Sequence, residues 1–129
     1  VGTAKAVNVI GISVTGTDAA NYTFNTTATA AANVTARALT ITAAGQNRVY
    51  DGTTNAGVTF SDNRVAGDTL SISSIASFAD KNVGTGKTVS VTGINVTGAD
   101  AANYTFNTTA ATAANITARA LTVSATGQN

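Results

Sequence analysis

The sequence predicts an all-β protein built from small two-layer domains repeated in tandem. Val, Ile, Thr, Tyr and Phe alternate with polar residues in short runs separated by turn-forming residues, which is typical of strands with one buried face. In addition, residues 1–47 align without a gap with residues 83–129, and 35 of the 47 positions are identical. The offset between the copies is 82 residues, which favours separate β-domains in series over a solenoid coil.

The repeat divides the chain into three parts. Residues 38–119 are predicted to form one complete repeat, residues 1–37 the C-terminal part of a preceding repeat, and residues 120–129 the first strand of a following one. No Gly/Ser-rich or Pro-rich linker separates these parts, so we expect an elongated, stiff rod. Because the chain starts inside a repeat and without Met, we expect it to belong to a longer protein.

The strands are expected where alternation is clearest, at residues 39–43, 58–60, 70–78, 87–97, 104–107 and 116–120. Within 87–97 the apolar positions change from odd to even numbers at Gly93, which predicts a β-bulge. Alanine runs at 28–32 and 110–114 fit either a strand or a short helical turn.

Six residues are expected to have structural roles. Asp51-Gly52 marks a turn, and Tyr50 beside it is expected to pack at the corner. Gly93 is assigned to the bulge. Tyr104 and Phe106 share one strand parity and are therefore expected on the buried face.

The composition argues against catalysis. The chain has no His and no Cys, and all six acidic residues are Asp, so no Ser–His–Asp or Cys–His arrangement can form. Transition-metal sites lack their usual ligands, and the Asp and Asn pairs in turn-like segments are better explained by turn formation than by calcium binding. We therefore predict no enzymatic activity, no cofactor and no metal site.

The charge pattern argues against two further classes of partner. The net charge is +1, and the seven basic residues are scattered, whereas a nucleic-acid surface needs them clustered. No apolar run approaches the ~20 residues of a membrane span.

Seven N-x-T sequences are candidate glycosylation sites, although alternation of Asn and Thr along a strand produces the same pattern. They begin at Asn21, Asn25, Asn33, Asn95, Asn103, Asn107 and Asn115.

Three segments resemble a known family. The sequence RVYDGTT at 48–54 resembles the YDGTT signature of YDG-type repeats, which are related to the MBG repeats of very large bacterial surface proteins. The segment ADKNVGTGKTVSVTGINVTGADAANYTF resembles the second signature of that family, and ITARALTV resembles its junction. The resemblance implies filamentous haemagglutinin-like or autotransporter-like adhesins at the bacterial cell surface, with long arrays of small domains of β-sandwich or β-grasp character. It implies no catalytic residue or cofactor.

We expect a structural repeat of a secreted bacterial surface fibre or adhesin stalk, with a role in cell adhesion through reach, cohesion and surface presentation. Two alternatives remain open. One is a subunit of a self-assembling extracellular filament with strand exchange between neighbours. The other is an adhesive module that binds glycan or protein. The expected partners are neighbouring repeats, like chains in a filament, or a glycan or protein of a host or cell surface.

Overall fold

The computed structural model describes residues 1–129 and consists of strands with two short 3₁₀ turns and no α-helix, which confirms the prediction of an all-β protein. The chain divides into two compact units, the N-terminal unit Val1–Arg37 and the C-terminal unit Ala38–Asn129. The elements, in chain order, are β1 (Gly2–Ile10), η1 (Ala19–Asn21), β2 (Thr27–Val34), β3 (Arg37–Leu39), β4 (Ile41–Gln46), β5 (Arg48–Val49), β6 (Gly57–Asp62), β7 (Ser71–Phe78), β8 (Gly84–Thr97), η2 (Ala101–Asn103), β9 (Tyr104–Phe106) and β10 (Ala110–Thr117).

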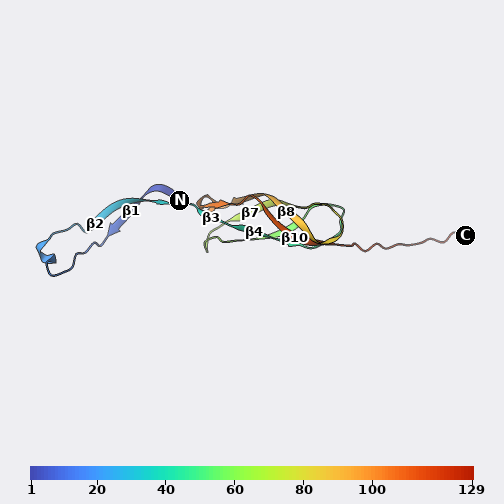
Figure 1. Cartoon of the computed structure of the whole chain (residues 1–129), viewed down its shortest axis with the longest axis horizontal. Helices are drawn as coiled ribbons and strands as arrows, with labels where there is room; N and C mark the ends of the chain where they lie inside the picture. The colour runs from blue at the N-terminus through green and yellow to red at the C-terminus, as the bar shows by residue number, and fades with distance from the viewer. The chain divides into compact units, whose positions relative to one another are not determined.

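The main sheet of the C-terminal unit has the strand order β5-β10-β8-β7. Three of its strands, β7, β8 and β10, are labelled in Figure 1. The 14-residue strand β8 is antiparallel to both of its neighbours, β7 and β10. The two-residue strand β5 pairs in parallel with the end of β10. Because β8 has paired strands on both sides, its apolar residues form the centre of the sheet's buried face.

The β7–β8 pairing shifts by one residue at Gly93. Ser73 of β7 pairs with Asn95, whereas Ile75 pairs with Thr92, so β8 carries one more residue than β7 between these pairs. Gly93 has φ 59°, a left-handed conformation that glycine adopts without a steric penalty. A one-residue shift reverses which parity faces the core, and the apolar residues on both sides of Gly93 are buried.

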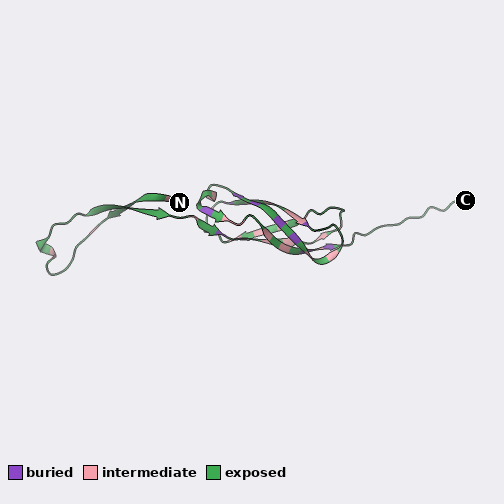
Figure 2. Cartoon of the chain, turned by 45° about the horizontal axis from the view of Figure 1, so that its top comes forward, coloured by how far each residue is buried: buried purple, intermediate pink, exposed green.

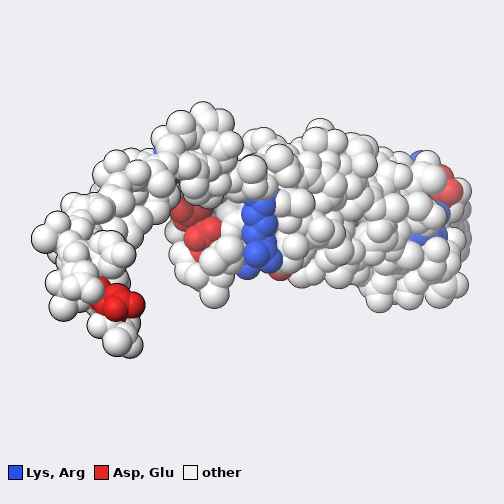
Figure 3. All heavy atoms as spheres, turned by 60° about the vertical axis from the view of Figure 1, so that its left-hand side comes forward, with Lys and Arg blue, Asp and Glu red and all other residues white.

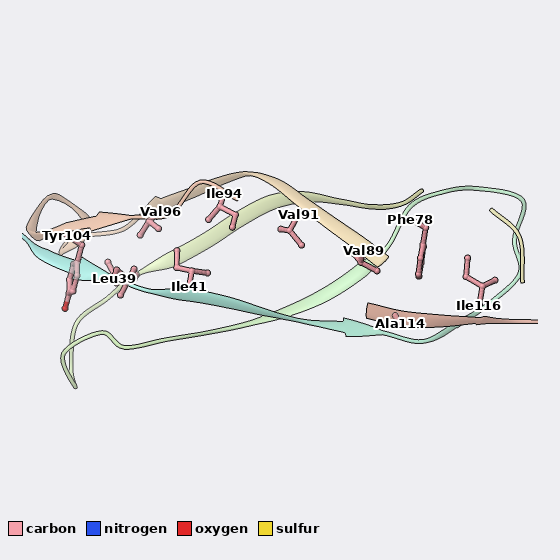
Figure 4. Packing of buried hydrophobic residues seen from close by; sticks show 11 residues of the cluster. Leu39, Ile41, Phe78, Val89, Val91, Ile94, Val96, Tyr104, Ala114 and Ile116 are labelled. Atoms are coloured by element: carbon pink, nitrogen blue, oxygen red, sulfur yellow. The ribbon is translucent and has the colours of Figure 1, made fainter. Parts of the chain in front are cut away.

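A second ribbon of two antiparallel strands, β4 and β6, packs against this sheet, and β3 pairs with β9. The close approach of β4 to β10 depends on Gly45, because a Cβ atom at this position would lie 2.5 Å from the Ala113 carbonyl oxygen. The Gly45 amide donates to Thr112 Oγ1 at 3.2 Å. The core side chains lie between β8 on one side and β4 on the other (Figure 4).

The core is a narrow row of side chains between the two layers. Leu39 and Tyr104 lie at one end of it, and Phe78 and Ile116 lie at the other (Figure 4). The chain therefore enters this core at one end and leaves it at the opposite end. The buried apolar residues are Leu39, Ile41, Leu70, Phe78, Val89, Val91, Ile94, Val96, Tyr104, Ala114 and Ile116.

The N-terminal unit is an antiparallel pair of strands, β1 and β2. Val7 pairs with Ala30 in this unit, and Val89 pairs with Thr112 in the C-terminal unit. With the offset of 82 residues, the two pairings have the same register. The alanine runs lie within β2 and β10, so they form strands and not helical turns.

The two copies of this strand pair differ in burial. Val7 is 42% exposed, whereas its counterpart Val89 is fully buried. Val34 is 51% exposed, and its counterpart Ile116 is 1% exposed. In Figure 2 the strands of the N-terminal unit are coloured as exposed except at Gly2, whereas those of the C-terminal unit include buried residues.

Residues 118–129, at the end of the C-terminal unit, form no strand. Leu121 and Val123 in this segment are 86% and 83% exposed. Their counterparts in the repeat, Leu39 and Ile41, are each 2% exposed in β3 and β4. Equivalent residues are thus buried in β3 and β4, which have partner strands, and exposed in residues 118–129, which form no strand.

Replacing Val89 by Ala is expected to destabilise the C-terminal unit by about 2–3 kcal/mol, because the change removes two fully buried methyl groups and leaves a cavity in a thin core. The matched change Val7→Ala removes the same atoms from an exposed position and is expected to alter stability by less than about 0.5 kcal/mol. Urea unfolding of both variants measures the difference, and equal losses of stability would contradict the assigned core.

Candidate functional site: the signature turn and its neighbouring anchors

The residues Tyr50, Asp51 and Gly52 form a turn, called here the signature turn, that follows the short strand β5. Hydrogen bonds to Asp51 close this turn. The Asp51 Oδ1 atom accepts hydrogen bonds from the Thr53 amide at 2.9 Å, from Thr53 Oγ1 at 2.8 Å and from Arg48 Nη1 at 2.6 Å. Gly52 between them has φ 83°. The Tyr50 amide donates to the Thr117 carbonyl at 2.8 Å, which fixes the turn to the end of β10, and the Tyr50 ring packs against the core.

Arg48 connects this turn to the core. Its guanidinium carbon lies 5.3 Å from the centre of the Phe78 ring, a distance at which a cation interacts favourably with an aromatic face. Its Nη2 atom donates to the Thr53 carbonyl, while its buried Nε atom has no partner. Arg48 therefore covers one end of the core and holds both arms of the turn.

A second anchor fixes the loop that joins β6 to β7. The Tyr104 hydroxyl donates to Asp68 and accepts a hydrogen bond from the Val65 amide at 2.9 Å. From the other side of the loop, Asp100 Oδ2 accepts from the Thr69 amide at 2.8 Å. Tyr104 thus has its ring in the core and its hydroxyl bonded to the loop. This arrangement gives the hydroxyl of a buried tyrosine the hydrogen-bond partners that it needs.

Arg64 and Asp62 reinforce the same loop. Arg64 Nε donates to Asp62 Oδ1 at 2.8 Å and Nη2 donates to Oδ2 at 2.6 Å, which is a bidentate pair. Arg64 Nη1 also donates to the Leu70 carbonyl at 2.9 Å. At the start of β8, Lys87 Nζ pairs with Asp80 and donates to the Asn82 carbonyl at 2.7 Å.

These contacts lower the pKa of three carboxyl groups below the ordinary value of 3.8. The hydrogen bond from the Thr53 amide is the largest cause for the pKa of Asp51. The side-chain bonds from Arg64 are the largest cause for the pKa of Asp62. The bond from Lys87 is the largest cause for the pKa of Asp80. The native structure therefore favours the ionised form of each group.

The comparison with known proteins agrees with the signature found in the sequence. Residues 35–114 match the YDG domain. The chain belongs to the YDG domain family. The matched range includes both anchors and runs from just before β3 into β10. No curated protein and no solved structure matches the chain.

Four asparagine side chains of the N-x-T sequences bond to the backbone. Asn107 accepts from the Ile41 amide at 2.8 Å and donates to the Ile41 carbonyl at 3.0 Å, which ties β4 to the loop after β9 of the YDG domain. Asn115 and Asn33 occupy equivalent positions and accept from the amides of Gly86 and Ala4, and Asn25 donates to the Thr27 carbonyl. The remaining N-x-T asparagines are exposed: Asn21, Asn95 and Asn103.

The other sequence-predicted residues are distributed along the YDG domain. Tyr50, Asp51 and Gly52 lie together in the signature turn, Gly93 lies on β8, and Tyr104 with Phe106 forms β9. Sequence reasoning missed the contributions of Arg48, Arg64 and Asn107. A sequence signal existed for Asn107, because its counterpart Asn25 is identical in the other copy.

The anchors bond to the loops beside them and leave no hollow there. No pocket opens in the described chain, and no group of three or more Asp side chains comes together where a metal ion would bind. On the face seen in Figure 3, most of the surface is free of charged side chains. No helix here has the length and apolar character needed to cross a membrane. What these side chains do chemically is hold the loops of a small β-domain in place.

The C-terminal unit is expected to lose stability as the pH falls below about 3.8. A carboxyl group whose pKa is lowered by folding contributes stability that is complete above its unfolded-state pKa and is lost as the pH falls through its folded-state pKa. Asp62→Asn removes one such group. The variant should be less stable than the parent at pH 7 and should show a smaller further loss between pH 4 and pH 2, as measured by urea unfolding at each pH.

The control for this series is Asp18→Asn, because Asp18 lies in the N-terminal unit and its side chain makes no hydrogen bond in the 3₁₀ turn that follows. It should leave the pH dependence of the C-terminal unit unchanged. An Asp62→Asn variant with the parent's full acid-induced loss would show that the Arg64 pair contributes nothing to acid stability.

Proposed function

We propose that this YDG chain is a structural repeat of a secreted bacterial surface fibre or adhesin stalk, and that its domains form an elongated rod outside the cell. The observation that carries the proposal is the position of the two chain ends in the C-terminal unit. Leu39, near the start of the repeat, and Ile116, near its end, lie at opposite ends of the core (Figure 4). A domain of this kind can be joined end to end with others without a linker.

The second copy of the strand pair supports a tandem array. The N-terminal unit has the register of β8 and β10 but exposes the residues that the C-terminal unit buries. Such a strand pair needs the counterparts of β4, β6 and β7 to remove its apolar face from water, because two strands alone are marginally stable. Those strands lie within residues 38–82 of the repeat, so a preceding repeat of the same kind would supply them.

A structural role without catalysis is supported by how the polar groups are used. The chain has no His, Cys or Glu. Arg48, Arg64 and Lys87 are each paired with a neighbouring aspartate and hold a loop. The resemblance of the signatures to repeats of large bacterial surface proteins supports an extracellular location. Filament assembly through strand exchange is the second candidate function, because apolar strand residues are exposed in both units.

Chains of two, four and six complete repeats, each with the sequence of residues 38–119, test the proposal. Because such arrays begin and end at repeat boundaries, every strand has its partners within the chain. The longest dimension from small-angle scattering should grow linearly, by about 45 Å per repeat, since the 14 residues of β8 span roughly that length. Sedimentation should show monomers throughout.

Two outcomes would contradict the proposal that the repeats form an elongated, monomeric rod. In one, the longest dimension grows much more slowly than the repeat number, which would indicate domains folded back on one another. In the other, the complete arrays associate, which would indicate that the outer surfaces of the repeats are adhesive. A glycan or host protein that binds a single complete repeat would favour the binding module over the stalk.

A further inference from the structure

The charged side chains of the complete repeat, residues 38–119, lie near the two ends of its core. The end that holds Leu39 and Tyr104 is called here the acidic end, and the end that holds Phe78 and Ile116 is called the basic end (Figure 4). Strands β4, β7 and β10, which run between the ends, carry no charged residue. Figure 3 shows a broad uncharged surface between groups of charged side chains. The charges of the repeat are therefore separated along its length.

The acidic end has three aspartates and one arginine, so its net charge is −2. These residues are Asp62, Arg64, Asp68 and Asp100. Asp68 accepts a hydrogen bond from the Tyr104 hydroxyl, and Asp100 accepts one from the Thr69 amide, which fixes both carboxylates at this end. Asp62 is paired with Arg64, whereas Asp68 and Asp100 form no salt bridge within the repeat.

The basic end has four basic residues and two aspartates, so its net charge is +2. These residues are Arg48, Asp51, Asp80, Lys81, Lys87 and Arg119. Arg48 lies over the Phe78 ring and pairs with Asp51, and Lys87 pairs with Asp80. Lys81 and Arg119 are exposed and form no salt bridge. Two cations at this end therefore match two carboxylates at the other in number and in opposite sign.

The chain leads directly from the basic end of one repeat to the acidic end of the next. Arg37 is the counterpart of Arg119, and a single residue separates it from Leu39, which lies at the acidic end (Figure 4). Ends joined so closely have a high effective concentration for one another. An attraction too weak to bring separate molecules together is then sufficient to hold adjacent ends in contact.

We propose that the basic end of each repeat docks on the acidic end of the repeat that follows it, and that attraction between their opposite net charges makes the junction stiff. The proposal rests on the proposed function, since it assumes complete repeats in tandem. The partner surface is a second domain of the same kind, which presents Asp68 and Asp100 to Lys81 and Arg119. Opposite net charges also favour this orientation over contacts between like ends.

A two-repeat array, each repeat with the sequence of residues 38–119, tests the proposal. The chain has no Cys, so Ser90→Cys in each repeat places one spin label per domain at an exposed position of β8. Pulsed electron paramagnetic resonance then measures the distribution of distances between the labels. The distribution should be narrow in about 20 mM salt and at least twice as wide in about 1 M salt, which shortens the screening length to roughly 3 Å.

Charge removal at the junction should reproduce the effect of salt. Lys81→Gln with Arg119→Gln in the first repeat removes the surplus cations that face the second repeat. Asp68→Asn with Asp100→Asn in the second repeat removes the surplus carboxylates and keeps an oxygen that can accept the hydrogen bonds from Tyr104 and Thr69. Each double variant should widen the distribution in low salt at least twofold.

The matched controls carry the same substitutions at the outer ends of the array. Lys81→Gln with Arg119→Gln in the second repeat, and Asp68→Asn with Asp100→Asn in the first, change ends that face no other repeat. These variants should keep the narrow distribution of the parent. If the outer substitutions widen it as much as the inner ones, the effect lies within the domain and the proposal is overturned. The salt series on the parent array needs no substitution at either end.

Failure of the junction and failure of the stalk give different results. A narrow distribution that neither salt nor the inner substitutions widen would retain the rod and remove the electrostatic junction. A broad distribution of the parent array in low salt would remove both, because the repeats would then be flexibly connected. A narrow distribution that widens with salt and with the inner substitutions alone supports both.

Discussion

The apolar face shared by β8 and β10 is removed from water only by strands that come earlier in the repeat. Val89 and Val91 lie on the middle strand of a sheet, and the ribbon of β4, which is more than 40 residues away in sequence, passes on the other side of the core (Figure 4). A hairpin can form its backbone hydrogen bonds alone, as β1 and β2 do, but its hydrophobic stabilisation depends on the second layer. The close crossing of β4 over β10 at Gly45 is therefore the constraint on which the core depends.

The core is small, and polar side chains do much to fix the conformations of the loops. Only eleven apolar residues are buried, so each loop is additionally held by a side chain that reaches its backbone. Arg48 holds the signature turn, Tyr104 and Arg64 hold the loop before β7, and Asn107 holds β4. Hydrogen bonds of this kind each add only about 1 kcal/mol, but they select one loop conformation from many. The turn of the family signature is thus one of the loops held in this way.

Much of the fold could be predicted from the sequence because it depends on local patterns. Alternation of apolar and polar residues indicated strands, and the duplication indicated that residues 1–37 and 83–119 share a structure type. Which strands would pair could not be predicted, because the parallel contact of β5 with β10 joins residues nearly 70 positions apart. The anchoring contributions of Arg48 and Arg64 were equally inaccessible, because charged residues in turn-like segments are usually solvated. Asn25 and Asn107 were candidate glycosylation sites or products of Asn and Thr alternation along a strand, and neither explanation indicated the bonds that Asn107 forms to β4.

The opposite positions of Leu39 and Ile116 also determine how the C-terminal unit would respond to tension. A pull applied through its two chain ends acts along the core, so it slides β10 past β8 and β5 instead of peeling it away. The hydrogen bonds between these strands then share the load. Survival under force is governed by the unfolding rate more than by equilibrium stability. A domain with so thin a core can therefore be mechanically stronger than its modest number of buried residues suggests.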